Sequence, residues 1–181
     1  LGITTSGSLL RWFRELLNLP PEALHTLEQE AAQSPPGGRN LLVFPCFMGA
    51  RSARWDADAR GVLLGLGLGH TRGDIARAMM EGVGYETLSC LEGLRAIGID
   101  PSEVVAMGGG ARSDLWVRIK ADILALPVLR PRHTETASIG VSVVPMTACP
   151  FQGMANITRP SRVWGTMMAV SPGRKSWLST R

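Results

Sequence analysis

Three consecutive glycines, Gly108–Gly110, constrain the fold of this 181-residue chain more than any other feature of its sequence. They follow residues 103–107, a short apolar stretch with the β-branched side chains typical of a buried strand. They precede residues 115–124, in which apolar side chains recur at helical spacing, and Ser113 is a natural N-cap for that helix. The sequence therefore predicts a strand, a tight glycine turn and a helix in succession.

A glycine turn of this kind has two interpretations. Glycine permits positive φ and close approach of the backbone, and the first turn of the following helix offers unpaired N–H groups and a positive dipole end to an anion. The same turn also occurs as a tight connection that binds nothing. Two better-known motifs are excluded: the glycines of residues 65–69 do not complete a dinucleotide-binding fingerprint, and no Gly-Lys pair of a P-loop occurs in the chain.

Composition indicates an ordinary globular domain, with 45% hydrophobic and 19% charged residues. The net charge of +4 arises from residues 141–181, which hold five basic residues and no acidic one, so we expect no nucleic-acid partner. Apolar runs are too short to span a bilayer, and we expect no membrane partner. The cysteines, Cys46, Cys90 and Cys149, are too widely spaced for a disulfide framework or a zinc site, which favours a cytoplasmic protein without a metal site in this chain.

The remaining segments fit an α/β layer around the glycine turn. Thr71 and Asp74 predict a capping box at the start of a long helix that ends near Gly98. From about residue 146 onward, Pro, Gly, Ser and Thr predominate without a period, and we expect irregular or poorly ordered chain. The other expected elements are helices at 9–17 and 23–32, apolar segments at 41–45, 61–66 and 127–131, and a loop at 48–60.

Several of these segments together resemble the C-terminal domain of the FGGY carbohydrate kinases, most closely the xylulokinase-like branch. The family's C-terminal signature is matched by Gly61, Leu63, Gly65, Leu66, Asp74, Ile75, Ala78, Met79, Met80 and Glu81. Residues 55–61 resemble the family's W-D-P-x-A-R-G, residues 108–116 its G-G-G-A-x-S-x-x-W, and residues 134–138 the segment that opens its last core helix. We expect the signature residues to serve packing more than substrate contact, because glycines at strand and helix junctions often do so.

The resemblance implies one lobe of the actin-like, ribonuclease H-like ATPase fold, a mixed sheet with flanking helices that is incomplete in this chain. Residues 1–140 would form an N-terminally truncated C-terminal domain, and residues 141–181 a divergent, irregular basic tail. ATP would lie in the cleft between two lobes, with Mg²⁺ as the second cofactor. The resemblance places Gly108, Gly109, Gly110 and Ala111 beside the nucleotide. It places Asp114 at a polar contact to adenine.

By the same resemblance the function is transfer of the ATP γ-phosphoryl group to a sugar hydroxyl, with a pentulose such as xylulose expected. We assign no catalytic residue, because relatives carry that aspartate ahead of the position of Leu1 and take most sugar contacts from the N-terminal lobe. Relatives also carry G-E-R-T-P where this chain has Gly-Ala-Arg-Ser-Ala at 49–53, so this loop keeps Arg51 but lacks the acidic residue and the proline of the family. A non-catalytic interaction module, an unstable gene remnant and a homodimer stay open.

Overall fold

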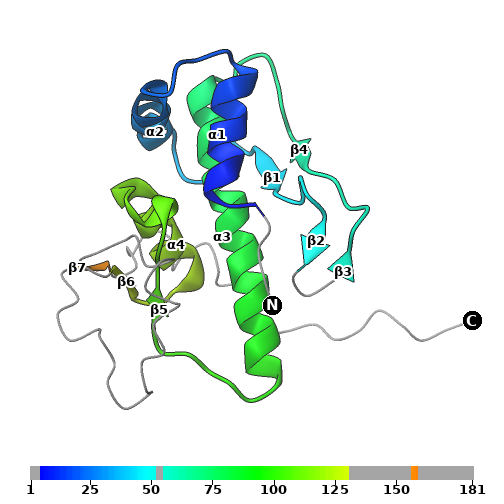
Figure 1. Ribbon diagram of the computed structural model, residues 1–181, viewed down its shortest axis with the longest axis vertical. Helices are drawn as coiled ribbons and strands as arrows, with labels where there is room; N and C mark the ends of the chain where they lie inside the picture. Colours follow the sequence, from blue (N-terminus) through cyan, green and yellow to red (C-terminus); the bar gives the residue numbers. More distant parts are fainter. Residues whose placement is uncertain (1–4, 52–54, 131–155, 159–181) are drawn as a thin grey trace, which may run out of the picture.

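The computed structural model describes residues 5–51, 55–130 and 156–158 (Figure 1). The helices are α1 (Gly7–Leu16), α2 (Ala23–Gln33), α3 (Arg72–Ala96) and α4 (Asp114–Leu124), and a 3₁₀ turn spans Gly109–Ala111. The strands are β1 (Leu42–Phe44), β2 (Ala50–Arg51), β3 (Trp55–Asp56), β4 (Val62–Leu64), β5 (Val104–Val105), β6 (Val128–Arg130) and β7 (Asn156–Thr158). These bounds confirm the predicted helices and most of the predicted strands.

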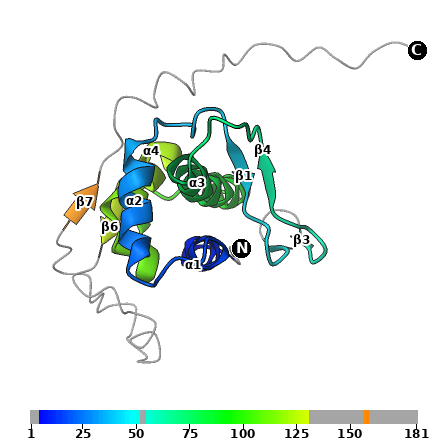
Figure 2. The same ribbon diagram turned by 90° about the horizontal axis from the view of Figure 1, so that it is seen from above.

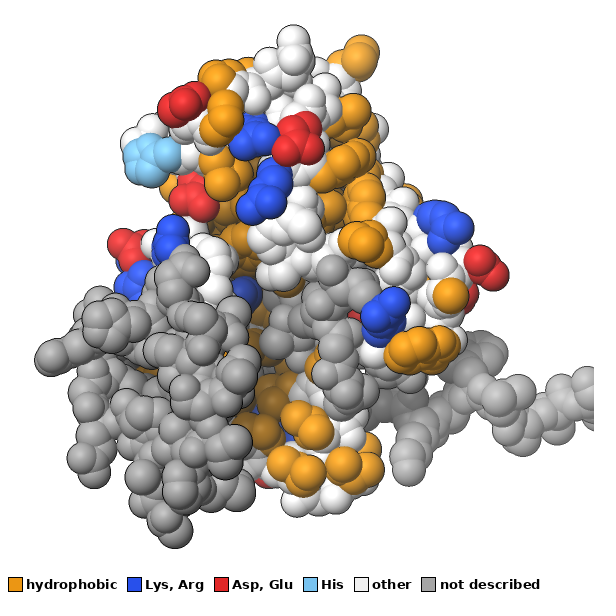
Figure 3. Space-filling view, in the orientation of Figure 1, with side chains coloured by type: hydrophobic (Ala, Val, Ile, Leu, Met, Phe, Trp, Pro, Cys, Tyr) orange, Lys and Arg blue, Asp and Glu red, His pale blue; other side chains and the backbone are white. Residues whose placement is uncertain are grey.

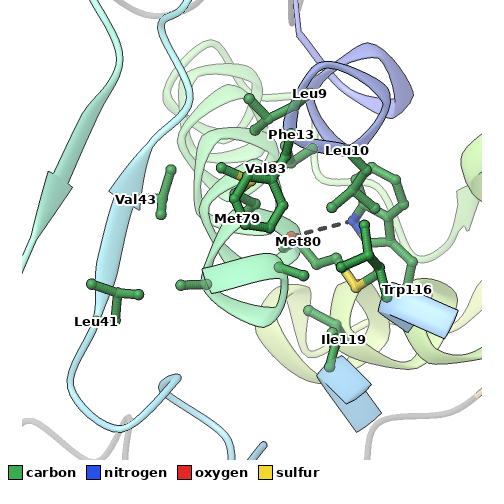
Figure 4. Packing of buried hydrophobic residues seen from close by; sticks show 14 of the residues in the cluster. Leu9, Leu10, Phe13, Leu41, Val43, Met79, Met80, Val83, Trp116 and Ile119 are labelled. Atoms are coloured by element: carbon green, nitrogen blue, oxygen red, sulfur yellow. Dashed lines mark hydrogen bonds between the residues drawn. The ribbon is translucent and has the colours of Figure 1, made fainter. Parts of the chain in front are cut away.

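Helix α3 is the centre of the described fold. Seen along its axis, it is surrounded by α1, α2, α4 and the pair β1 and β4 (Figure 2). One hydrophobic cluster joins these elements, and the side chains of α1, β1, α3 and α4 point toward one another within it (Figure 4). The buried Trp116 of α4 contributes its ring to this cluster, and its indole N–H donates a hydrogen bond of 3.2 Å to the Met80 carbonyl of α3. The core therefore fixes α4 against α3.

The ends of α3 confirm the predicted signals. The Thr71 hydroxyl accepts a hydrogen bond from the Asp74 amide at 3.2 Å, and the Asp74 carboxylate accepts one from the Thr71 amide at 2.8 Å. This reciprocal pair is a capping box, which satisfies two of the amides left unpaired at a helix start. At the other end Gly98 adopts a φ of +84°, a conformation that glycine takes without a steric penalty.

The segment expected as a loop at residues 48–60 contains a small β-hairpin, so that expectation is wrong in part. Ala50 of β2 pairs with Asp56 of β3, and Arg51 pairs with Trp55. The Arg51 guanidinium lies 5.7 Å from the centroid of the Trp55 ring, a cation–π contact that favours this pairing. Next to the hairpin, β1 and β4 form an antiparallel pair in which Val43 lies opposite Leu63.

The strand, glycine turn, helix and strand predicted from the sequence form one parallel crossover. β5 and β6 pair in parallel, with α4 as their connection, so the predicted α/β layer is confirmed. β7 pairs antiparallel with the other edge of β6 and corrects the expectation of irregular chain at residues 156–158. This pairing satisfies hydrogen-bonding groups of the β6 backbone. Because the two strands are far apart in the sequence, local sequence patterns do not predict it. The expected elements at 134–138 and the rest of the expected tail lie outside the described residues.

Candidate functional site

The triple glycine lies directly after β5 and turns the chain into α4. Gly108 has a φ of +78°, which favours glycine. The amides of Ala111 and Arg112 then donate hydrogen bonds of 3.0 and 3.1 Å to the carbonyls of Gly108 and Gly109. These bonds fix the shape of the turn within the chain itself.

The outer side of the turn is open. Gly108 and Gly109 are exposed, and a Cβ atom at either position would meet no atom of the described chain within 4 Å. Gly109 also has no positive φ, so neither its backbone conformation nor packing against the described residues requires glycine there. A residue without a side chain in such a place is expected where a ligand approaches the main chain.

Helix α4 presents its N-terminus beside this open backbone. Ser113 is buried, and its hydroxyl accepts a hydrogen bond of 3.2 Å from the Trp116 amide, which confirms it as the N-cap. The 11-residue helix contributes partial positive charge at this end. The turn and the helix start together form a surface suited to an anionic group.

Asp114 and Arg130 form an ion pair at the edge of the turn. The Asp114 side chain is 82% exposed, and its carboxylate accepts a hydrogen bond of 2.6 Å from Arg130. The same arginine group lies 3.4 Å from the Ala111 carbonyl. Arg130 was missed in the sequence, although it ends a strand parallel to β5, and the carboxyl ends of parallel strands meet at one edge of a sheet.

Lys120 is the second residue that sequence reasoning missed at this site. Its ammonium lies 5.1 Å from the centroid of the Trp116 ring, and burial lowers the pKa of this group. A Cβ atom at Gly110 would lie 3.9 Å from the same Nζ and 3.4 Å from the Trp116 ring. The available signal was a lysine four residues after a tryptophan on an otherwise apolar helix face.

The predicted site residues therefore come together: Gly108, Gly109, Gly110 and Ala111 form the turn, and Asp114 stands beside it. The family signature lies elsewhere: its first residues lie at β4, and those from Asp74 to Glu81 lie on α3. Its last residue, Glu81, is 1% exposed and accepts hydrogen bonds from Arg77 at 2.7 Å and from the Gly37 amide at 3.1 Å. Burial raises the pKa of the Glu81 carboxyl.

Asp74, another signature residue, is also buried and internally bonded. It accepts a hydrogen bond of 2.6 Å from the Ser34 hydroxyl, and this bond, with those from Thr71, lowers the pKa of Asp74 to about 2. Asp74 and Glu81 thereby hold residues 34–39 against α3. The expected structural role of the signature is confirmed at these two positions.

A hollow of about 440 Å³ opens beside Asp74, and no residue of the glycine turn lines it. Its charged groups neutralise one another: Arg72 pairs with Glu30 at 2.6 Å, and Arg39 lies 3.5 Å from Asp74. The hollow therefore offers no net charge to an ionic ligand.

Within residues 5–51, 55–130 and 156–158, no three His, Cys, Asp or Glu side chains gather in a way that could hold a metal ion. The carboxylate at the glycine turn, Asp114, is already bonded to Arg130. These residues do not fit direct coordination of Mg²⁺. Among the described helices, none is long and apolar enough to cross a membrane.

The chain belongs to the FGGY family of carbohydrate kinases, because residues 2–149 match the model of that family's C-terminal domain. The match continues past residue 140, where the resemblance noted in the sequence ended. Among known proteins, a glycerol kinase of Deinococcus radiodurans is 34% identical over 142 residues, which are 78% of this chain and 28% of that protein. A xylulose kinase of Staphylococcus epidermidis is 31% identical over 145 residues, 80% of this chain and 29% of that protein.

Solved structures agree on the fold. The crystal structure of a xylulose kinase from Rhodospirillum rubrum matches with a TM-score of 0.70 and 29% identity, over 91% of this chain and 36% of that one. A gluconate kinase from Lactobacillus acidophilus matches with a TM-score of 0.76 over 90% of this chain and 35% of that one, at 24% identity, and shows the fold alone. The chain has the actin-like ATPase fold of sugar kinases and spans about a third of the length of these relatives.

Proposed function

We propose that this chain supplies the nucleotide-side lobe of an ATP-dependent carbohydrate kinase, with Gly108–Ala111 against the nucleotide. The observation that carries the proposal is the exposed backbone at Gly109, where neither φ nor packing against the described residues calls for glycine. The N-terminus of α4 beside it favours an anionic ligand. Membership of a carbohydrate kinase family makes ATP the natural ligand of such a surface.

In this proposal the chain binds and orients the nucleotide. Gly109, Gly110 and Ala111 would lie near the α-phosphate and the ribose, and Asp114, held by Arg130, would be the polar neighbour of adenine. Bound ATP supplies the γ-phosphoryl group for a sugar hydroxyl. Mg²⁺ belongs to the proposed reaction, but the described residues contribute no site for it and we assign it no ligand.

We propose that the acceptor is a pentulose such as xylulose, reached through an N-terminal lobe. The similarity to a xylulose kinase supports this choice, and the similarity to a glycerol kinase makes glycerol the main alternative acceptor. We also propose a cytoplasmic location, which the free thiols of Cys46 and Cys90 support.

Nuclear magnetic resonance of the isotope-labelled chain tests nucleotide binding and its location together. On addition of ATP we expect the largest amide shifts at Gly109–Ala111 and in the first turn of α4. The first turn of α3, also a capped helix start, is the internal control and should shift little. Absence of shifts in a chain that unfolds cooperatively, or larger shifts at α3, would contradict the proposal.

A non-catalytic interaction module is the second candidate, and an exposed apolar face favours it. Figure 3 shows apolar side chains gathered at the β1 and β4 side of the molecule. Phe44, Val62 and Leu64 are 50%, 47% and 59% exposed, and Phe44 lies opposite Val62 in the strand pair. Stable self-association without nucleotide binding, measured by analytical ultracentrifugation, would favour this candidate, with a homodimer as its simplest form.

A further inference from the structure

Lys120 is a partly buried cation that no carboxylate of the described residues neutralises. Its ammonium stands over the Trp116 ring at 5.1 Å. Within the part of the chain that the structure describes, no carboxylate forms an ion pair with it, and desolvation is the cause of its lowered pKa. The position is therefore electrostatically unfavourable as the described fold stands.

Packing alone would select a different residue at position 120. A desolvated ammonium without a counter-charge opposes folding, and contact with an aromatic face offsets only part of that cost. A leucine or methionine would cover the Trp116 ring without the penalty. The retained charge indicates a ligand of opposite sign.

The geometry of the glycine turn locates that ligand. A Cβ atom at Gly110 would lie 3.9 Å from Lys120 Nζ, so the ammonium borders the turn on the side of the Trp116 ring. Arg130, the cation that contacts the Ala111 carbonyl, is already bonded to Asp114 at 2.6 Å. Lys120 has no such carboxylate among the described residues.

We propose that Lys120 binds a phosphate group of the nucleotide held at the glycine turn, an inference that rests on the proposed function. The ammonium would donate a charge-assisted hydrogen bond to a phosphate oxygen, while the turn supplies backbone amides. The ligand class is a nucleoside phosphate, and the nucleoside without phosphate lacks the group that Lys120 recognises.

Calorimetric titration of Lys120→Met with ATP, AMP and adenosine tests the inference. Methionine keeps an unbranched apolar side chain over Trp116 and removes the charge, so we expect the fold to be retained. Affinity for ATP and AMP should fall at least about tenfold, and affinity for adenosine should stay unchanged. The matched control is Arg118→Met, which removes an exposed charge from the same helix and should alter all three affinities little.

A second readout reports on Lys120 itself. In the reductively ¹³C-methylated chain, the pKa of Lys120 should rise on addition of AMP and not on addition of adenosine, because a phosphate favours the charged ammonium. If the wild-type chain binds ATP, and Lys120→Met binds each of the three ligands as tightly as the wild type does, Lys120 has only a packing role. The inference then fails while the proposed function stands. If the wild-type chain binds no nucleotide, the proposed function fails and the inference fails with it.

Discussion

Two regions of this molecule contain closely spaced glycines and differ in structure. On α3, Gly82 lies against the Val43 carbonyl and Gly84 against Ile123, so a side chain at either position would collide with the fold. In the turn before α4, a Cβ atom at Gly109 would meet no atom of the described residues within 4 Å. The first region uses glycine to bring elements of its own chain together, and the second leaves its backbone accessible. A glycine therefore indicates a ligand only where the described chain does not fill the space.

The largest expected effect tests the packed region. Gly82→Ala places a methyl group against a backbone carbonyl that cannot rotate away, and we expect the free energy of unfolding to fall by about 3 kcal/mol or more. Gly84→Ala meets the end of the Ile123 side chain at 2.6 Å, which can adopt another rotamer, so it should cost less than about 1 kcal/mol. Urea unfolding measures both variants, and equal losses would contradict the distinction.

The next effect concerns the buried charges of the same region. Glu81→Gln removes the negative charge that faces Arg77 and should lower the free energy of unfolding by about 2 kcal/mol. Glu30→Gln removes one partner of the more exposed pair with Arg72 and should cost about 0.5 kcal/mol. A larger loss for Glu30→Gln than for Glu81→Gln would contradict the expectation that the buried pair contributes more to stability than the exposed pair.

A smaller effect is the acid sensitivity that Asp74 confers. Its pKa of about 2 lies below the ordinary value of 3.8, so its carboxylate stabilises the fold above pH 3.8 and this contribution is lost as the pH falls toward 2. Solvent in the adjoining hollow screens the effect, and we expect on the order of 1–2 kcal/mol. The free energy of unfolding of wild type and of Asp74→Asn is measured by urea unfolding from pH 5 to pH 2. The difference between the two isolates the contribution of the Asp74 carboxylate from that of Glu81, whose pKa shifts in the opposite direction. A difference that does not change with pH would contradict it.

Local signals in the sequence predict much of this fold. The capping box of Thr71 and Asp74 and the glycine turn with its Ser113 cap depend on residues a few positions apart, and the structure has both. The hairpin of β2 and β3 and the pairing of β7 with β6 depend on cross-strand contacts that local patterns do not contain.

The same distinction holds at the candidate site. The turn residues were predictable because they are contiguous. Arg130 reaches the turn from the next strand, and Lys120 reaches it from the second turn of α4. Their contacts exist only after β6 and α4 have packed, so spacing in the sequence alone does not identify them.

The most direct test of the difference between the two regions is Gly109→Val, measured for stability and for ATP affinity in the same preparation. Because no described atom lies within 4 Å of a Cβ at this position, the free energy of unfolding should change by less than about 1 kcal/mol. Calorimetric affinity for ATP should fall at least about tenfold, because the side chain occupies the space that the nucleotide needs. An unchanged affinity, or a loss of stability as large as that of Gly82→Ala, would contradict the assignment of the open turn to a ligand.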